Sequence, residues 1–439
     1  MKNFLILQSS YSLFFNELGL NLKKENQIYS LCFSLGDKYL KSNLKNALLW
    51  KEIKEIKIKS NFKEKISEIL KIDNLYFKLR EKVDEEELTL KEKEYFYKYY
   101  KFLEKYLIDN KIDKIVMMND LRWQHAIAIH LSKKLNIKYF VFELGLFRPN
   151  TITLDSKGVN YNNSVPKDKE FYLELKGLNK FDYTKINSDI TEKQRNIVIA
   201  KYMILNMIGK LFGIYTPANN RNSILDYFKR FKNSYLKKKD KENITLENKY
   251  IFAPLQVKTD TQTLVHSDYK NMIEFMEDTI QGVKKYREKY NSNIELVFKE
   301  HPMDCGKVLY DDFYIKYKKF TWIKFLKGIN TKEVIKNSEM IITINSTVGL
   351  EAIEMYKPVI CMGRSFFTID GIAKKSNSLK LADDINDALK EMKDKKIIDN
   401  FLNYLRYEYS IEGNLYYYNE KQIKEVSNII LGDNKKVFV

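Results

Sequence analysis

Two carboxylate side chains in this sequence are placed where a catalytic acid, base or nucleophile would be expected. Glu143 lies behind a run of apolar and aromatic residues, and Asp260 follows Pro254-Leu255-Gln256 among amides and hydroxyls. A carboxyl in apolar surroundings is expected to have a raised pKa, which suits Glu143 to act as a general acid. A separation of about 5 to 5.5 Å between the two carboxyls would fit a retaining double displacement. A separation of about 6.5 to 9.5 Å would fit an inverting reaction. Each side chain could equally form an internal salt bridge or a cap.

A second set of residues is suited to bind an anion such as a phosphate. The apolar run Met340–Ile344 leads through Asn345-Ser346-Thr347 into a predicted helix, whose free N–H groups and dipole favour negative charge. Glu351 would lie about one turn into this helix. There it could accept hydrogen bonds from ribose hydroxyls or simply face solvent. Ordinary N-capping by Ser346 is the alternative for the motif itself.

His301 extends this anion site to a second strand end. It follows the apolar run Glu295–Lys299 almost directly and precedes Pro302, which fixes the backbone after the imidazole. The carboxyl ends of parallel strands are where open α/β sheets bind ligands. A histidine that merely caps a loop is the alternative.

Further charged residues follow the predicted strand Lys114–Asn119. Asp120 and Arg122 come directly after this strand, and His125 lies on the helix that follows. Taken singly, each could belong to an internal salt bridge or a cap. Together with Glu143 and Asp260, they would supply two carboxylates from opposing domains and several cations around one cleft.

These residues need two sheets to bring them together. Short β-branched or aromatic runs alternate with helical stretches twice along the chain, which indicates two parallel sheets with crossover helices. A ligand then binds at the carboxyl ends of the strands, in the crevice between the two units. The runs are Asn3–Gln8, Lys114–Asn119 and Lys138–Glu143, then Tyr250–Leu255, Glu295–Lys299, Met340–Ile344 and Pro358–Met362, with helices expected at 269–290, 348–356 and 383–394.

We therefore predict an α/β fold of GT-B-like type, in which two Rossmann-type domains face a central cleft. Residues 1–165 form the first domain and residues 248–390 the second. Residues 166–247 are expected to be a helical interdomain region with a Lys-rich exit at 236–241. Residues 391–439 are rich in Tyr and Lys, and would pack back across the first domain or form a membrane-contacting face.

Composition and charge limit the classes of protein to consider. The 439 residues are 44% hydrophobic and 14% aromatic, which excludes a disordered chain, and Lys+Arg 76 against Asp+Glu 58 gives a net charge of +18. No segment interleaves arginines with aromatic residues as nucleic-acid binders do, so no nucleic-acid partner is expected. An anionic membrane surface or an anionic substrate fits the charge.

The cysteines and the apolar runs exclude several other classes. Cys32, Cys305 and Cys361 are widely spaced and form no Cys/His cluster, so neither a disulfide scaffold nor a zinc site is supported. The short N-terminal apolar run does not fit a signal peptide, and no apolar run is long enough for a transmembrane helix. We expect a protein of the reducing cytoplasm that needs neither metal nor cofactor.

The ordered motifs of this chain resemble the bacterial capsule polysaccharide biosynthesis family of the KpsS and LipB type. They run from about residue 5 to about residue 373. The residues that carry the resemblance are Glu143-x-Gly145-x-x-Arg148-Pro149, Ile152-Thr153-Leu154, Gly158-Val159-Asn160, Pro254-Leu255-Gln256, Asp260-x-Gln262, His266-Ser267, Lys299-Glu300-His301-Pro302 and Asn345-Ser346-Thr347-Val348-Gly349-Leu350-Glu351-Ala352.

This resemblance implies a retaining β-Kdo glycosyltransferase with a GT-B-like fold. Its donor would be CMP-Kdo, and its acceptor a phosphatidylglycerol-type lipid on which the capsule linker is started. It would act as a peripheral protein at the inner face of the cytoplasmic membrane, beside capsule assembly and export proteins. The alternatives are a transferase for another CMP-linked acidic sugar, a non-catalytic scaffold of capsule export, and a sugar-nucleotide epimerase of the same architecture.

The resemblance also implies roles for individual residues. Asp260 would be the nucleophile and Glu143 the acid/base, with the second domain binding the CMP-sugar. The donor-binding residues would be Gln256, Lys299, His301, Asn345, Ser346, Thr347 and Glu351, and the further substrate contacts Arg148, Asn160, Asp120, Arg122 and His125.

The chain departs from the family pattern at two positions. Ser9 replaces an expected glycine, and Leu144 stands where a second acidic residue is common. The second change leaves Glu143 as the single carboxyl of that motif.

Overall fold

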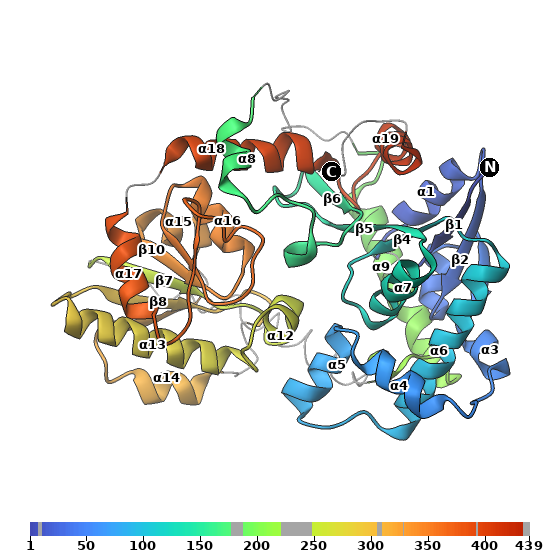
Figure 1. Cartoon of the computed structure of the whole chain (residues 1–439), viewed down its shortest axis with the longest axis horizontal. Helices are drawn as coiled ribbons and strands as arrows, with labels where there is room; N and C mark the ends of the chain where they lie inside the picture. The colour runs from blue at the N-terminus through green and yellow to red at the C-terminus, as the bar shows by residue number, and fades with distance from the viewer. Residues whose placement is uncertain are drawn as a thin grey trace.

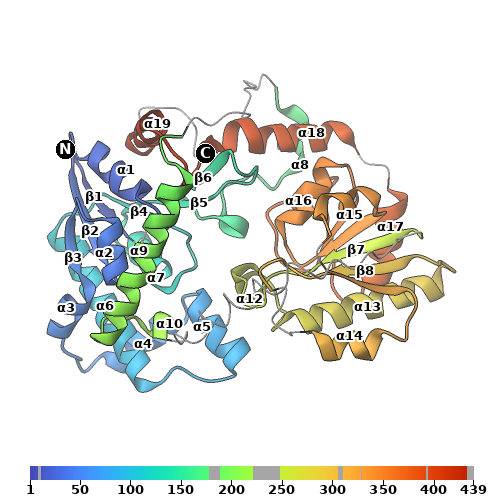
Figure 2. The ribbon, with the colours of Figure 1, turned by 180° about the vertical axis from the view of Figure 1, so that it is seen from behind.

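A computed structural model describes residues 1–7, 11–176, 188–220, 248–304, 310–327, 329–391 and 394–432. Figure 1 shows two α/β units, each built around one sheet, and Figure 2 shows the same units from behind. Ser9, Cys305 and the Lys-rich segment 236–241 lie outside the described residues, whereas Cys32 and Cys361 are buried free thiols.

The N-terminal sheet has seven strands in the order β13-β6-β5-β4-β1-β2-β3. The strands β1 to β5 run parallel, β6 is antiparallel to β5, and β13 is antiparallel to β6. The order 3-2-1-4-5-6 within this sheet is that of a doubly wound Rossmann fold. The strands are β1 Asn3–Ile6, β2 Gln27–Cys32, β3 Lys45–Leu48, β4 Lys114–Met118, β5 Lys138–Leu144, β6 Thr151–Asp155 and β13 Ile411–Glu412.

The C-terminal sheet repeats this order. Its six strands lie in the order β12-β11-β10-β7-β8-β9, and every adjacent pair is parallel. The predicted α/β fold with two Rossmann-type units is therefore confirmed. The strands are β7 Tyr250–Pro254, β8 Glu295–Lys299, β9 Ile323–Leu326, β10 Met340–Thr343, β11 Val359–Cys361 and β12 Lys374–Lys375.

Each sheet is buried on both faces, which explains why its central strands are apolar throughout. Along β1, Phe4 and Ile6 join the apolar cluster on one face, and Leu5 and Leu7 join the cluster on the other. Side chains alternate across a strand, so every residue of such a run meets a helix layer. The helices that supply those layers include α1 Phe14–Leu22, α6 Leu90–Asp109, α7 Trp123–Leu135 and α19 Glu420–Leu431 in the first unit, and α13 Met272–Lys289, α15 Thr331–Asn337, α16 Thr347–Glu354, α17 Leu381–Lys390 and α18 Lys395–Asn403 in the second.

The shorter helices mostly connect the strands or cover the edges of the units. Three helices of the second unit, α13, α16 and α17, lie where helices were predicted. Among the described helices, none is both long and apolar enough to cross a membrane. In the described part of the chain, the remaining α-helices are α2 Leu35–Leu40, α3 Leu49–Glu52, α4 Phe62–Leu70, α5 Leu75–Leu79, α8 Lys169–Glu174, α9 Glu192–Leu211, α10 Pro217–Asn220, α12 Thr261–His266 and α14 Asp311–Tyr317.

Residues 166–247 and 391–439 follow the two Rossmann units, and their described helices pack against other elements of the fold. Of residues 166–247, α9 packs on α2 of the first unit, and α8 packs on α18. The approach of α9 to α2 is close, because a Cβ added to Gly36 would lie 2.7 Å from the carbonyl oxygen of Tyr202. Beyond residue 391, β13 joins the edge of the first sheet and α19 packs on α1 (Figure 1).

Contacts between the two units involve α5 and α12. The Nζ of Lys82 donates hydrogen bonds to the carbonyl oxygens of Ser267 at 2.8 Å and Tyr269 at 3.1 Å. These hydrogen bonds hold the two units against each other, whereas the ion pair between Lys169 and Asp370 at 2.7 Å fastens α8 to the second unit, whose apolar cluster includes Tyr172 of α8.

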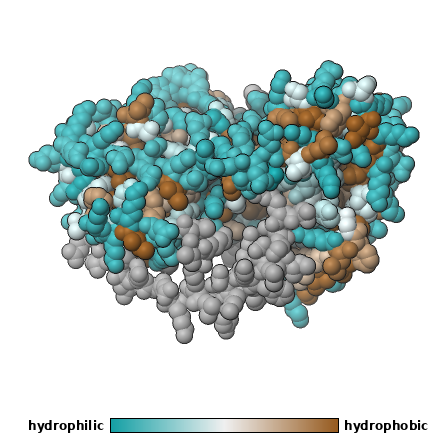
Figure 3. Space-filling model, turned by 90° about the horizontal axis from the view of Figure 1, so that it is seen from below, coloured by the Kyte–Doolittle hydropathy of each residue, from teal (hydrophilic) through white to brown (hydrophobic). Residues whose placement is uncertain are grey.

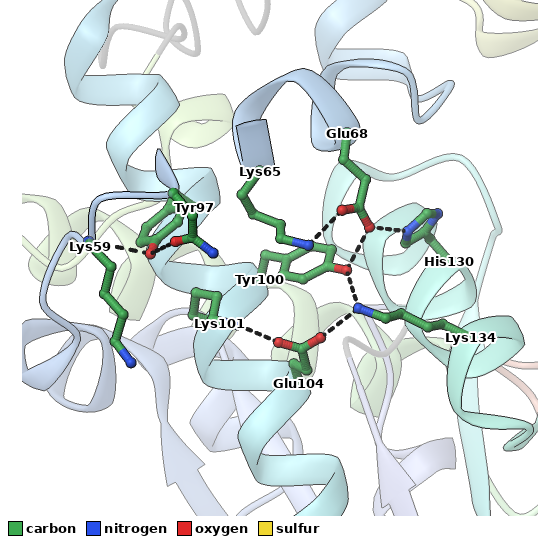
Figure 4. A network of polar contacts seen from close by, with 10 residues as sticks. Lys59, Lys65, Glu68, Tyr97, Tyr100, Lys101, Glu104, His130 and Lys134 are labelled. Carbon is green, nitrogen blue, oxygen red and sulfur yellow. Dashed lines mark hydrogen bonds and ion pairs between the residues drawn. The ribbon is translucent and has the colours of Figure 1, made fainter. Parts of the chain in front are cut away.

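A polar network fastens α4 to α6 and α7 (Figure 4). The carboxylate of Glu68 accepts hydrogen bonds from Lys65 Nζ at 2.5 Å and Tyr100 Oη at 2.8 Å, and lies 2.9 Å from His130 Nε2. Burial alone would raise the pKa of Glu68, but these donors outweigh burial and lower it to about 2. The ionised carboxylate therefore holds α4 in place.

We expect Glu68→Gln to lower the melting temperature at pH 7 by a few degrees. The folded-state pKa lies below the ordinary value of 4.5. The carboxylate's contribution is therefore present above about pH 4.5 and lost as the pH falls toward 2. Thermal unfolding at pH 7 and at pH 3 measures this, and the gap between wild type and variant should narrow at pH 3. The exposed Glu64 on the same helix provides the control Glu64→Gln, and an equal loss in both variants contradicts the role of the network.

Candidate functional site

The best-defined polar cluster lies at the switch point of the second sheet, between β7 and β10. Gln256 follows β7 and Asn345 follows β10, and both are buried. Their amides pair: Gln256 Nε2 donates to Asn345 Oδ1 at 3.1 Å, and the backbone N–H of Asn345 donates to Gln256 Oε1 at 3.2 Å. The pair joins the carboxyl ends of two strands whose crossovers leave in opposite directions.

Asp260 is held beside this pair. It is the N-cap of α12, where its Oδ1 accepts from the backbone N–H of Gln262 at 3.0 Å, and its Oδ2 accepts from Gln256 Nε2 at 3.2 Å. Burial raises the pKa of Asp260 from its ordinary value of 3.8, and the nearby Asp304 adds to that rise. Each oxygen of the carboxylate thus accepts one hydrogen bond.

Asn345 acts through its neighbours. Its Nδ2 donates to the carbonyl oxygens of Gln262 at 2.9 Å, Arg364 at 3.2 Å and His266 at 3.4 Å. These bonds draw α12 toward the end of β10. Asn345, predicted to bind the donor, is therefore placed to position Asp260 and Gln256.

His301 and Asp304 lie on the loop after β8, next to Asp260. His301 Nδ1 accepts from the backbone N–H of Met303 at 3.1 Å, which leaves Nε2 to carry the hydrogen. The imidazole is close enough to Asp260 to favour its ionised form. Asp304 is buried and accepts from the backbone N–H of Lys258 at 2.7 Å. The sequence reasoning missed Asp304, although its place three residues after His301 was a signal.

The N-terminus of α16 lies next along the same edge of the sheet. Ser346 caps the helix by accepting from the backbone N–H of Val348 at 3.2 Å, and Thr347 is exposed beside it. Glu351 is half-buried one turn further on. Lys299 is buried and donates to Thr331 Oγ1 at 3.0 Å, so it reaches toward the start of α15.

Glu143 lies on β5 of the first sheet, opposite Thr153 of β6. Its Oε2 accepts from Asn119 Nδ2 at 3.0 Å and its Oε1 from the backbone N–H of Leu144 at 2.9 Å, and the side chain is half-buried. Side chains alternate across a strand, so the apolar Phe142 faces the opposite side of the sheet, and the Glu143 carboxylate accepts from two N–H donors. Asn119 was not predicted to belong to the site. In the structure it follows β4 with a positive φ of 69°, a conformation in which asparagine is found more often than most residues.

Asp120 is buried behind Glu143. Its Oδ2 accepts from Asn162 Nδ2 at 2.9 Å and from the backbone N–H of Val159 at 3.2 Å. Burial, with a smaller effect from the Glu143 charge, raises the pKa of Asp120 to about 6. The first unit thus places two carboxyls near each other, one half-buried and one fully enclosed.

His125 is fully buried and lies under this pair. Its Nδ1 donates to the carbonyl oxygen of Asn119 at 2.8 Å. Burial, with help from the Arg122 charge, lowers the pKa of His125 to about 3, so the ring is neutral. His125 was expected to touch substrate as one of several cations, but the structure gives it a place in fixing the Asn119 turn.

The other predicted contacts are spread around the first unit. Arg122 lines a cavity of about 240 Å³ together with Ser34, Trp123 and Tyr202. Arg148 is exposed, with its Nε donating to the carbonyl oxygen of Gly145 at 3.2 Å, and Asn160 is half-buried. Within the described ranges, no group of three or more His, Cys, Asp or Glu side chains could hold a metal ion.

The predicted residues therefore form two groups. Asp260, Gln256, Asn345 and His301 are brought together at the second sheet, with the α16 N-terminus beside them. Glu143, Asp120 and His125 are brought together at the first sheet through Asn119. Carboxylates of this kind can serve as nucleophile and as acid or base, and the α16 N-terminus can bind a phosphate.

We expect Asp120→Asn to change how stability depends on pH. A raised folded-state pKa means that the carboxyl's contribution is fully present below its ordinary pKa of 3.8 and is lost as the pH rises through about 6. From pH 4 to pH 8, wild type should lose roughly 2 kcal/mol relative to the variant. Urea unfolding across this range measures the difference. The exposed Asp312 offers the control Asp312→Asn, and a pH-independent difference for Asp120→Asn contradicts the assignment.

Known proteins are similar in sequence to this chain over much of its length. It is 26% identical over 297 residues to the capsule polysaccharide modification protein LipB of Neisseria meningitidis serogroup B, covering 63% of this chain and 69% of LipB. It is 25% identical over 277 residues to the capsule polysaccharide export protein KpsS of Escherichia coli, covering 59% and 69%.

Solved structures are more distant. The chain aligns with KpsC of Thermosulfurimonas dismutans, a β-Kdo 2,7 transferase, at 15% identity and a TM-score of 0.34, covering 69% of this chain and 89% of that one. It aligns with the UDP-GlcNAc 2-epimerase of Methanocaldococcus jannaschii at 15% identity and a TM-score of 0.33, covering 98% and 100%. Scores this low support no assignment for this chain.

The family comparison spans both groups of site residues. Residues 113–416 match the family described as capsule polysaccharide biosynthesis protein, a stretch that begins just before β4 and ends after β13. It holds Glu143, Asp260 and His301 as well as the α16 N-terminus. This chain therefore belongs to the capsule polysaccharide biosynthesis protein family.

Proposed function

We propose that this protein is a retaining β-Kdo glycosyltransferase that transfers Kdo from CMP-Kdo to a phosphatidylglycerol-type lipid. The observation that carries the proposal is the Asp260 carboxylate. It is fixed by Gln256 and by the α12 N-terminus, at the strand ends where a sugar nucleotide would bind. Membership of the capsule family supports a role in capsule polysaccharide biosynthesis. The choice of sugar and lipid follows from the resemblance of the ordered motifs to the KpsS and LipB type.

In the first step, an oxygen of Asp260 attacks the anomeric C2 of Kdo. The bond between C2 and the phosphate oxygen breaks, and its electron pair leaves with CMP, which needs no proton because a phosphate monoester is a stabilised leaving group. The hydrogen bond from Gln256 Nε2 and the N–H of Gln262 keep the carboxylate in one orientation for this attack. A covalent Kdo ester of Asp260 results.

In the second step, Glu143 removes the proton from the acceptor hydroxyl. The hydroxyl oxygen attacks C2, and the ester bond to Asp260 breaks, which regenerates its carboxylate. Two inversions at C2 give net retention. The half-buried Glu143, oriented by Asn119, suits this task better than the enclosed Asp120.

The charge that develops on the departing phosphate needs donors. The N–H groups at the start of α16, the hydroxyls of Ser346 and Thr347 and the Nε2–H of His301 would supply them, and Lys299 would add positive charge. Losing one such donor costs about 2.7 to 4 kcal/mol in the transition state. Glu351 would accept from the ribose hydroxyls, and Arg148, Arg122 and Asn160 would contact the Kdo carboxylate or the acceptor.

The proposal needs no metal or cofactor. It places the protein on the inner face of the cytoplasmic membrane, near the capsule assembly and export proteins, because the acceptor lipid lies there. The net charge of +18 fits attraction to an anionic leaflet.

We expect Asp260→Ala to lose transferase activity by about 10³-fold or more, and Glu143→Gln by about 10² to 10⁴-fold. The measurement is lipid product formed from CMP-Kdo and a fluorescent phosphatidylglycerol. Intact mass spectrometry of Glu143→Gln with CMP-Kdo should show a Kdo adduct, because the second step is blocked. The exposed Asp268 provides the control Asp268→Ala, which should retain wild-type activity.

The outcomes separate the competing functions. No turnover of CMP-Kdo by a folded protein, with turnover of another CMP-linked acidic sugar, makes this a transferase with a different donor. Capsule assembly that survives Asp260→Ala in cells indicates a non-catalytic scaffold. Turnover of a UDP-sugar without any acceptor indicates an epimerase.

A further inference from the structure

Helix α9 exposes an unusual number of large apolar side chains. Leu211 is 77% exposed, Phe212 at its end 74%, and Ile204 55%. Exposed apolar residues are normal when they occur singly, but a contiguous patch marks a surface that something covers. The other members are Ile197, Met203, Met207, Ile208 and, just beyond the helix, Tyr215.

These side chains form a ridge on the outer side of α9. The inner side carries Tyr202 and Gly209, which are buried, and Asn206, whose Oδ1 accepts from the backbone N–H of Gly36 of α2 at 3.0 Å. At about 100° per residue, Ile204 and Leu211 project opposite Tyr202. Figure 2 shows α9 running along the outside of the first unit. A helix that packs inward through one face and is apolar on the other needs a second partner.

Beyond its first residue, Glu192, the charged residues of α9 are all basic. From residue 193 to residue 220 the chain carries no Asp or Glu, and its charged residues are Lys193, Arg195, Lys201 and Lys210. Lys201 and Lys210 lie on the two flanks of the ridge, about 100° and 80° from Tyr202 on either side. Desolvation lowers the pKa of Lys210 from its ordinary value, which is consistent with a lysine set among apolar groups.

We propose that the α9 ridge is an interfacial surface that docks this protein onto an anionic lipid bilayer. An apolar stripe flanked by cations is the pattern of helices that lie in the plane of a membrane, with the stripe among the acyl chains and the cations at the headgroups. A second copy fits the ridge less well, because a two-fold contact would bring the same cations together. Figure 3 shows the lower face of the molecule, where hydrophilic residues predominate and the larger apolar patches lie on the half that holds the first sheet.

Docking through α9 would bring the lipid close to the first unit's site. Tyr202, on the inner side of α9, lines the cavity of about 240 Å³ that also contains Arg122. Tyr11 lines this cavity and a second, largely apolar one of about 230 Å³ that Ile197 and Val198 of α9 border. One helix width, about 10 Å, therefore separates the bilayer from a cationic cavity. This consequence rests on the proposed function, whereas the docking itself does not.

The test is co-sedimentation of the full chain with vesicles, in the absence of any sugar donor. Wild type should bind vesicles of equal parts phosphatidylcholine and phosphatidylglycerol, and bind phosphatidylcholine alone at least tenfold more weakly. The double variant Ile204→Ser with Leu211→Ser should bind the anionic vesicles at least tenfold more weakly than wild type. Its melting temperature should be unchanged, since both side chains face outward.

Matched controls lie on the other unit. Ile315 and Leu379 are 72% and 86% exposed, so Ile315→Ser with Leu379→Ser removes similar apolar area without touching α9 and should bind as wild type. Lys201→Glu with Lys210→Glu should weaken binding to anionic vesicles and leave phosphatidylcholine binding unchanged.

Three results would overturn the proposal. Equal vesicle binding by wild type and the α9 double variant shows that the membrane contact lies elsewhere. A dimer in light scattering that the α9 variant converts to a monomer assigns the ridge to a second copy. A fall in melting temperature in the α9 variant alone assigns it to the protein's own packing. Hydrolysis of CMP-Kdo in detergent, without vesicles, tests the transferase independently of docking.

Discussion

The strand order 3-2-1-4-5-6, present in both sheets, is the constraint on which the rest of the structure depends. Where that order reverses, successive crossovers leave toward opposite faces, and the loops after the two central strands open apart. In the second sheet, the buried Gln256–Asn345 pair bridges these loops and orients Asp260. In the first sheet, Asn119 follows the central strand β4 and orients Glu143. The loops and strand ends at these edges thus hold the carboxylates of Asp260 and Glu143 in fixed orientations.

The end of the chain strengthens the strand that carries Glu143. The strand β13 pairs with β6, and β6 pairs with β5, so the last quarter of the chain completes the sheet around the acid. Asn414 Nδ2 donates to the carbonyl oxygen of Pro149 at 2.8 Å, and Tyr409 Oη donates to Asp155 at 3.0 Å. These bonds join residues more than 250 positions apart, so the end of the chain supports the sheet that carries Glu143.

Burial separates the roles of the acidic residues. Asp120 is enclosed, and its pKa is raised to about 6, whereas Glu143 next to it remains half-buried and reachable. Asp260 combines a raised pKa with two oriented oxygens and a histidine beside it. Neighbouring carboxyls therefore differ in function through the space and the donors around them. The same principle distinguishes the two faces of α9, whose inner side packs on α2 while its outer side presents apolar groups to its surroundings.

The sequence by itself determined the fold class and the chemistry-bearing residue types. The apolar runs at β1, β4, β5, β7, β8, β10 and β11 are recognisable because strands buried on both faces must be apolar throughout. The edge strands β3, β9 and β12 carry polar residues, so no local pattern predicts them. Tertiary structure alone decided that Asn345 and His125 position other groups and that Asn119 belongs to the first site. Hydrogen bonds between strand ends, such as that from Gln256 to Asn345 across 89 positions, have no sequence periodicity, because only the folded sheet brings their partners together.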